Sequence, residues 1–168
     1  MYPQGNFVAT NQIIDPDLPC QDTENSWYAL DVEGELRLLR VARALGEDLP
    51  VRIVPTLLAL HALPPEYRDR RDDYVALVAG QLIPRAASEK LATSVDAFSE
   101  AIAFTPAEVE RVFQAAARHG LPVRLHAEQL SNHGGAALAA KYKALSADHL
   151  EHQDTDHGPR RHASALRS

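Results

Sequence analysis

The sequence lacks several features that mark particular classes of protein. Its single cysteine, Cys20, excludes an internal disulfide. No apolar run reaches the roughly 18 residues of a transmembrane helix, so we expect no membrane association. The basic residues are scattered along a chain of net charge −6, and no face collects them into a phosphate-binding stripe. Nucleic acid is therefore not an expected partner.

Targeting and nucleotide-binding signals are also missing. The opening residues, MYPQGNFVATNQ, have neither the charged start nor the apolar stretch of a secretory leader, so we expect a cytoplasmic protein. The glycine fingerprints GxGxxG and GxxxxGK[ST] do not occur. What is present is 168 residues with 45% hydrophobic content, enough for one compact core.

The apolar pattern divides the chain into three parts. Residues 1–25 are rich in Pro, Asn, Gln and Asp and show no regular period, which predicts an irregular or disordered segment. Residues 26–151 carry the periodic patterns of a folded domain. Residues 152–168 lose the pattern again, and we expect a disordered tail.

The first half of the domain predicts a helix, a strand and a second helix. Apolar residues at helical spacing begin after Asp31, which can cap the helix, and Gly46 can end it. The run LPVRIVPTLLALHAL then suits a strand buried on both faces of a parallel sheet. A helix follows in EYRDRRDDYVALVAGQLIP, where Pro84 marks a stop or a kink.

The second half continues the alternation. SVDAFSEAIAF predicts a strand, and the next helix has Thr105 as N-cap, Pro106 in the first turn and Glu108 closing a capping box. Three further elements then follow in order: the strand VRLHAEQ, the helix GGAALAAKYKAL and the strand LSADHL. The order βαβαβαβ predicts an α/β fold with a parallel sheet and outer helices.

Two architectures have this alternation, the doubly wound sheet and the (β/α)8 TIM barrel. The doubly wound sheet usually carries a glycine fingerprint after its first strand, and its absence favours the barrel. A complete barrel takes about 250 residues. With about four or five strands, this sequence predicts part of a barrel.

Polar residues recur where the predicted strands end. In barrels the chemistry lies at the carboxyl ends of the strands, so these side chains are expected to converge. Imidazoles from successive strand ends suit a metal ligand and a proton carrier, although a strand-end histidine is more often a hydrogen-bonded structural residue. The residues are His61, Glu100, His126 with Gln129, and Asp148 with His149.

The segment after His126 leaves alternatives open. If the strand continues, Glu128 shares the face of His126 and Gln129 points away, unless the chain has already turned into a loop. Gly134 and Gly135 could let backbone N–H groups approach an anion, but such a pair more often forms only a turn.

Four segments carry a specific resemblance. They are similar to consecutive parts of the imidazolonepropionases, metal-dependent hydrolases of the amidohydrolase superfamily, over about residues 26–151. The resemblance implies a (β/α)8 barrel with a small β domain. It also implies that water opens the ring of 4-imidazolone-5-propanoate to N-formimidoyl-glutamate on one zinc or iron ion, as a step of histidine degradation. The segments are ALHALPPEY, EAIAFTPAEVERVFQAA, GLPVRLHAEQLSNHGGAALAAKY and ALSADHLE.

The same resemblance implies roles for individual residues. His126 in LHAEQ matches a metal ligand, and His149 in SADH matches a residue that assists the attacking water. Gln129, His61 and Tyr28 match positions that contact the substrate.

The chain departs from the family pattern where other metal ligands are expected. It contains no His-x-His pair, and the resemblance stops at about Glu151, before the strand with the late Asp ligand. Trp27 and Ala29 stand where glycines usually flank the tyrosine, and Ala59-Leu60 stands where a glycine is expected before His61. Catalytic zinc sites use about three protein ligands. We therefore expect a truncated or frame-disrupted product that is inactive alone.

Two functional interpretations result. The first is an imidazolonepropionase-type hydrolase represented by the middle of its barrel. The second is a non-catalytic fragment or pseudoenzyme that binds a metabolite or a partner chain. An exposed barrel edge would favour association with a second copy or with a partner that completes the barrel.

Overall fold

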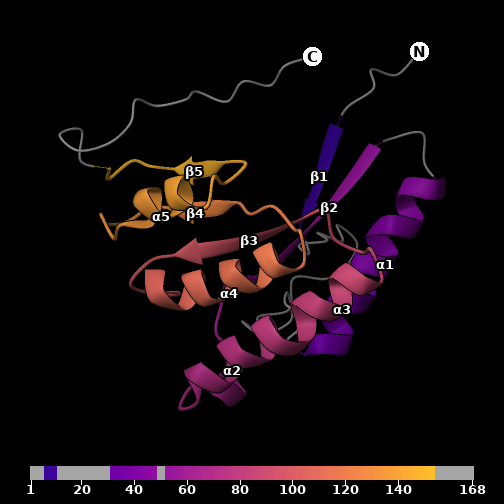
Figure 1. The fold of residues 1–168 in the computed structure, drawn as a ribbon, viewed down its shortest axis with the longest axis horizontal. Helices are drawn as coiled ribbons and strands as arrows, with labels where there is room; N and C mark the ends of the chain where they lie inside the picture. The colour runs from indigo at the N-terminus through magenta and orange to yellow at the C-terminus, as the bar shows by residue number, and fades with distance from the viewer. Residues whose placement is uncertain (1–5, 11–30, 49–51, 154–168) are drawn as a thin grey trace, which may run out of the picture.

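The computed structural model describes residues 6–10, 31–48 and 52–153. Within them the strands form one sheet in which every neighbouring pair is parallel and the order in the sheet follows the order in the chain (Figure 1). The strands are β1 (Asn6–Thr10), β2 (Arg52–Leu60), β3 (Ser94–Ser99), β4 (Leu125–Ala127) and β5 (Ala147–His149). This topology confirms the predicted α/β fold and is that of a partial (β/α)8 barrel.

Helices connect the strands, and α4 runs alongside β3 (Figure 1). Within the described ranges no helix is long and apolar enough to cross a membrane. The helical elements are α1 (Val32–Asp48), the 3-10 turn η1 (Pro65–Tyr67), α2 (Arg71–Leu77), the π-helical η2 (Val78–Leu82), α3 (Ile83–Ser88), α4 (Pro106–Arg118) and α5 (Gly135–Lys141).

Helix α1 begins as predicted but ends later. The Asp31 carboxylate accepts the N–H of Gly34 at 2.7 Å, which is the expected cap. The predicted end at Gly46 is wrong, because α1 continues to Asp48. Gly46 instead allows a close approach to β2, since a Cβ there would lie 3.3 Å from the Cβ of Ile53.

The helical stretch from Arg71 to Ser88 passes through Pro84, so of the predicted stop or kink the stop is excluded. Proline has no N–H, and its ring clashes with the carbonyl four residues earlier, which here belongs to Gly80. The π-helical turn Val78–Leu82 lies at this point. In a π-helical turn the hydrogen bonds join residues five positions apart instead of four, which explains how the helix continues past the proline.

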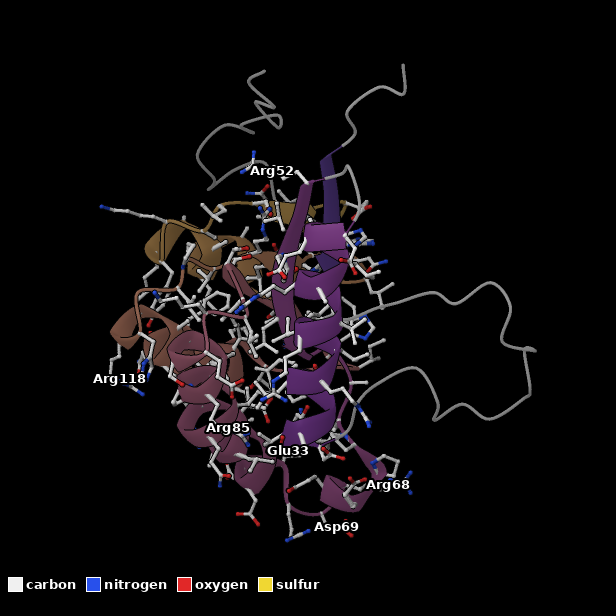
Figure 2. The ribbon with its side chains drawn as sticks, turned by 90° about the vertical axis from the view of Figure 1, so that its right-hand side faces the viewer. Glu33, Arg52, Arg68, Asp69, Arg85 and Arg118 are labelled. Carbon is white, nitrogen blue, oxygen red and sulfur yellow. The ribbon has the colours of Figure 1, made fainter. Side chains whose placement is uncertain are left out.

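Helix α4 forms as the sequence predicts. The Thr105 hydroxyl accepts the N–H of Glu108 at 3.3 Å, and Glu108 Oε2 accepts the N–H of Thr105 at 2.7 Å, which completes the capping box. Arg71 of α2 donates to the same carboxylate at 2.9 Å and links the two helices. Figure 2 shows a similar connection, in which Glu33 of α1 pairs with Arg85 of α3.

The expectation of an irregular N-terminal segment is wrong for residues 6–10. They form β1 and pair in parallel with β2, from Asn6 opposite Arg52 to Thr10 opposite Thr56. The edge of β2 presents backbone donors and acceptors, and a segment with Phe, Val and Thr suits the strand that pairs with them. The remainder of residues 1–25, and residues 154–168, lie outside the described residues. The domain limits 26–151 stay a prediction.

The two faces of the sheet differ in character. One face contributes Val95, Ala97, Leu125 and Ala127 to the apolar core that it shares with α4. On the strands, side chains alternate between faces, so the residues in between form the other face. We call this second set the polar face: Thr56, Ser94, Asp96, Arg124 and His126.

Candidate functional site

His126 on β4 is held by an acid from the neighbouring strand. Its Nδ1 lies 3.2 Å from Oδ1 of Asp96 on β3, and Asp96 is only 2% exposed. A carboxylate can only accept, so Nδ1 carries the hydrogen and donates it. Nε2 is then the nitrogen left for another partner. An imidazole oriented by a carboxylate in this way is typical of metal-binding histidines.

The same contact changes the charge state that His126 prefers. The hydrogen bond to Asp96 raises the pKa of His126 above its ordinary value of 6.5, and the negative charges of Asp96 and Asp148 act in the same direction. Partial burial opposes them without cancelling them. Because a metal needs the neutral imidazole, protons and metal ions would compete for this ring.

His149 at the end of β5 lies beside His126. The two ring centroids are 5.5 Å apart, and the register of β4 and β5 places His149 opposite Ala127. Nδ1 of His149 is 3.5 Å from a carboxylate oxygen of Glu151. The left-handed backbone of His149 and Leu150, with φ of 76° and 66°, turns the chain sharply at the strand end. The structure therefore brings together the two histidines that were predicted from the sequence to be a metal ligand and a proton carrier.

His61 follows β2 and is joined to the site by an aromatic contact. Its ring stacks on Phe98 of β3 with centroids 5.6 Å apart, and Phe98 is the register partner of His126. Burial lowers the pKa of His61 below 6.5, and the charge of His126 acts in the same direction. The pKa values of His61 and His126 are therefore shifted in opposite directions.

Strand β4 ends at Ala127, which decides the position of the next two residues. Glu128 has a left-handed φ of 49° and is 1% exposed, and Oε2 of its carboxylate accepts the N–H of Ala136 at 2.8 Å. Of the two alternatives left open by the sequence, the structure shows the second, because the chain has already turned into a loop after Ala127 and Glu128 does not continue the strand. Gln129 lies half-buried in the loop that follows.

Glu100, after β3, is bonded to that same loop. Its carboxylate accepts the N–H groups of Leu130 at 2.9 Å and Ser131 at 3.2 Å, and the Ser131 hydroxyl at 2.7 Å. Burial by itself would raise the pKa of Glu100, but these donors outweigh burial and hold the pKa below 4.5. Glu100 lies at the predicted edge of the sheet, but its carboxylate oxygens accept hydrogen bonds from the loop.

The Gly134-Gly135 pair serves the turn into α5. Gly134 has a φ of 81°, which favours glycine. A Cβ on Gly135 would come within 2.8 Å of the Ala127 Cβ, so the helix packs this close to β4 only without a side chain there. The carboxylate at this helix start is the internal Glu128, which accepts the N–H of Ala136.

Comparison with curated proteins finds relatives of the chain. No family model matches it. The imidazolonepropionase of Ectopseudomonas mendocina (strain ymp) is 60% identical over 129 residues, covering 77% of this chain and 32% of the relative. That of Rhizorhabdus wittichii is 62% identical over 131 residues, covering 78% and 33%, and that of Serratia proteamaculans (strain 568) is 61% identical over 127 residues, covering 76% and 31%. Over about three quarters of its length, the chain is similar to the imidazolonepropionases.

The chain spans about a third of the length of the curated imidazolonepropionases it matches. Tyr28, predicted to contact substrate, lies outside the described residues. His61, His126 and His149 lie within them, as does Gln129. The structure shows where these side chains are, and their individual roles stay predictions.

Asp96 is the site residue that sequence reasoning missed. A signal was present, because Ser94, Asp96 and Phe98 alternate with the apolar Val95 and Ala97 along β3. The alternation places Asp96 on the polar face. It does not show that His126 is the partner, because that depends on the register of β3 with β4.

Imidazolonepropionases are metal-dependent hydrolases in general, so the possible metal ligands among the described residues are of interest. In the described part of the chain no group of three or more His, Cys, Asp or Glu side chains is placed to hold one ion. His126 is a single oriented imidazole, whereas a catalytic zinc uses about three protein ligands. The described residues therefore do not make a metal site by themselves.

Proposed function

We propose that the chain carries part of an imidazolonepropionase active site, which opens the ring of 4-imidazolone-5-propanoate with water to give N-formimidoyl-glutamate. One observation supports this most directly. His126, oriented by Asp96, lies beside His149 at the carboxyl ends of adjacent parallel strands. Catalytic groups of (β/α)8 barrels lie at this end of the strands.

Each histidine suits a different task in that reaction. His126 is the candidate ligand for the family's zinc or iron ion, in a set that needs ligands beyond the described residues. His149 is exposed at the end of β5 near Glu151, which suits a group that exchanges a proton with water. His61, with Gln129 and Tyr28, is the proposed contact for a planar, polar substrate ring. A small-molecule substrate of histidine degradation also fits a cytoplasmic location.

A second candidate is a non-catalytic fragment or pseudoenzyme that retains a metabolite surface or pairs with another chain. Two observations favour it. The sequence has no His-x-His pair, and the described residues place no group of three ligands together. A second copy or a partner chain could then supply the missing strands and ligands.

A metal analysis combined with a ring-opening assay tests the two candidates. The purified chain is supplied with zinc or iron, freed of excess metal, and assayed for N-formimidoyl-glutamate, with its size in solution measured in parallel. Stoichiometric metal with turnover would exclude the second candidate, provided that both are lost in His126→Ala and retained in His119→Ala, which changes the C-cap of α4. Neither metal nor turnover, together with saturable binding of imidazole-4-propanoate, would establish the second.

A further inference from the structure

The loop between β4 and α5, residues 128–134, is bonded at both of its ends to buried carboxylates. Glu100 contacts Leu130 and Ser131 near its start, and Glu128 contacts Ala136 just after its end. Both glutamates are 1% exposed. A charge buried to this extent is stabilising only when hydrogen bonds replace its water, which these loop donors do.

Glu128 connects more than the loop. Its backbone carbonyl accepts the N–H of His152 at 2.9 Å, while its carboxylate accepts the N–H of Ala136 at 2.8 Å. One residue therefore ties the end of β4 to the start of α5 and to the chain just after His149. Its left-handed backbone turns the chain at the position before Gln129.

A direct chemical role for these two acids fits the geometry poorly. The oxygens of Glu100 are bonded to three donors of the loop. The carboxylate of Glu128 lies by α5, where it is 3.5 Å from the position of a Cβ on Gly135. Neither contact involves His126 or His149. Their contacts suit the fixing of the backbone between the strand end and the helix.

We propose that Glu100 and Glu128 are positioning residues, which fix the β4–α5 loop so that Gln129 is held at the carboxyl end of β4. The proposal rests on the proposed function for the role of Gln129 toward substrate. It assigns the loop a rigid conformation before any ligand binds, so that less conformational entropy is lost on binding.

Hydrogen exchange on the full chain tests the first part of the proposal. Both N–H groups bond Oε1 of Glu100, so in Glu100→Gln they lose a charged acceptor and keep at most a neutral amide oxygen, which is a weaker acceptor. We expect the amides of Leu130 and Ser131 to exchange roughly tenfold faster, the size expected when a hydrogen bond loses the charge of its acceptor. Amides of β3 and α4 should keep their rates. Glu66→Gln, at an exposed glutamate, is the matched control and should leave the loop unchanged.

A uniform increase across β3, α4 and the loop would overturn the proposal, because it would show a contribution to global stability only. Unchanged loop exchange would overturn it as well.

Affinity for imidazole-4-propanoate tests the link to Gln129. Where the unmodified chain binds this probe, Glu100→Gln should weaken binding several-fold and Glu66→Gln should not. Equal affinity of the unmodified chain and Glu100→Gln, despite faster loop exchange, would overturn the positioning of Gln129. An unmodified chain that does not bind the probe counts against the proposed function, and the exchange pattern then decides separately whether the carboxylates fix the loop.

Discussion

The two faces of the sheet are stabilised in different ways. The helix-covered face packs Val95 and Leu125 into a core with Phe113, where each side chain has many weak contacts. On the polar face, Thr56 bonds Ser94 at 2.9 Å and Asp96 bonds His126 at 3.2 Å, so each group depends on one partner from the next strand. The stability of the helix-covered face therefore depends on how well its side chains fill the core. The stability of the polar face depends on the register that brings each pair of groups together.

The largest effect is expected on the helix-covered face. Phe113 is fully buried, so Phe113→Ala should lower the free energy of unfolding by about 3–5 kcal/mol through lost burial and a cavity. Urea unfolding followed by circular dichroism measures it. Ile102→Ala is the control, because Ile102 is 77% exposed and should change stability by less than about 0.5 kcal/mol. A small effect of Phe113→Ala would remove the contrast between the faces.

On the polar face, the stability contributed by the hydrogen bond between Thr56 and Ser94 should depend on both hydroxyls being present. Thr56→Val leaves the buried Ser94 hydroxyl without its partner, which should cost about 1–3 kcal/mol. Thr56→Val with Ser94→Ala removes both hydroxyls and should cost less than the sum of the two single changes. The same urea experiment on all three variants gives the coupling. Additive costs would show that the hydroxyls do not depend on each other.

Acid should weaken the connection between α2 and α4. Burial tends to raise the pKa of Glu108, but the bonds from Arg71 and Thr105 outweigh it and hold the pKa below 4.5. Since the folded pKa is the lower one, this stabilisation is present above pH 4.5 and is lost as the pH falls below it. We expect a loss of about 1 kcal/mol, the usual size for a helix cap. Urea midpoints between pH 6 and pH 3 should fall less in Glu108→Gln than in the unmodified chain.

The subtlest expected effect concerns the charge of His126. Asp96→Asn removes the acid that raises the pKa of this histidine, so the pKa should fall. Histidine resonances followed by NMR across a pH titration measure the shift. Asp69→Asn, at an exposed aspartate, is the control and should leave the pKa of His126 unchanged. An unchanged midpoint for His126 would show that the contact with Asp96 does not set its protonation.

Much of the fold was predictable because its patterns are local. The capping box at Thr105 and the apolar stripe of α4 lie within one helix, and both are confirmed. The ends of elements were less predictable: Gly46 and Pro84 do not end their helices, since packing against Ile53 and a π-helical turn accommodate them. Strand β1 was missed because it depends on the edge of β2.

The candidate site was predictable as a set of strand ends and not as a set of contacts. His126 and His149 do lie together, because parallel strands end at the same edge. Asp96 was missed and the position of Glu128 was left open, since the first depends on which residue it faces across the sheet and the second on where β4 ends. That information depends on tertiary structure and cannot be obtained from the spacing of apolar residues in the sequence.

The agreement between strand order and chain order bears on how the molecule folds. Each strand pairs with the strand before and after it in the sequence, yet each parallel pairing still spans a crossover, and parallel sheets form slowly for that reason. We expect the β3–α4–β4 unit, with its strong helix cap, to form early, and the sheet to grow from it one crossover at a time toward both ends.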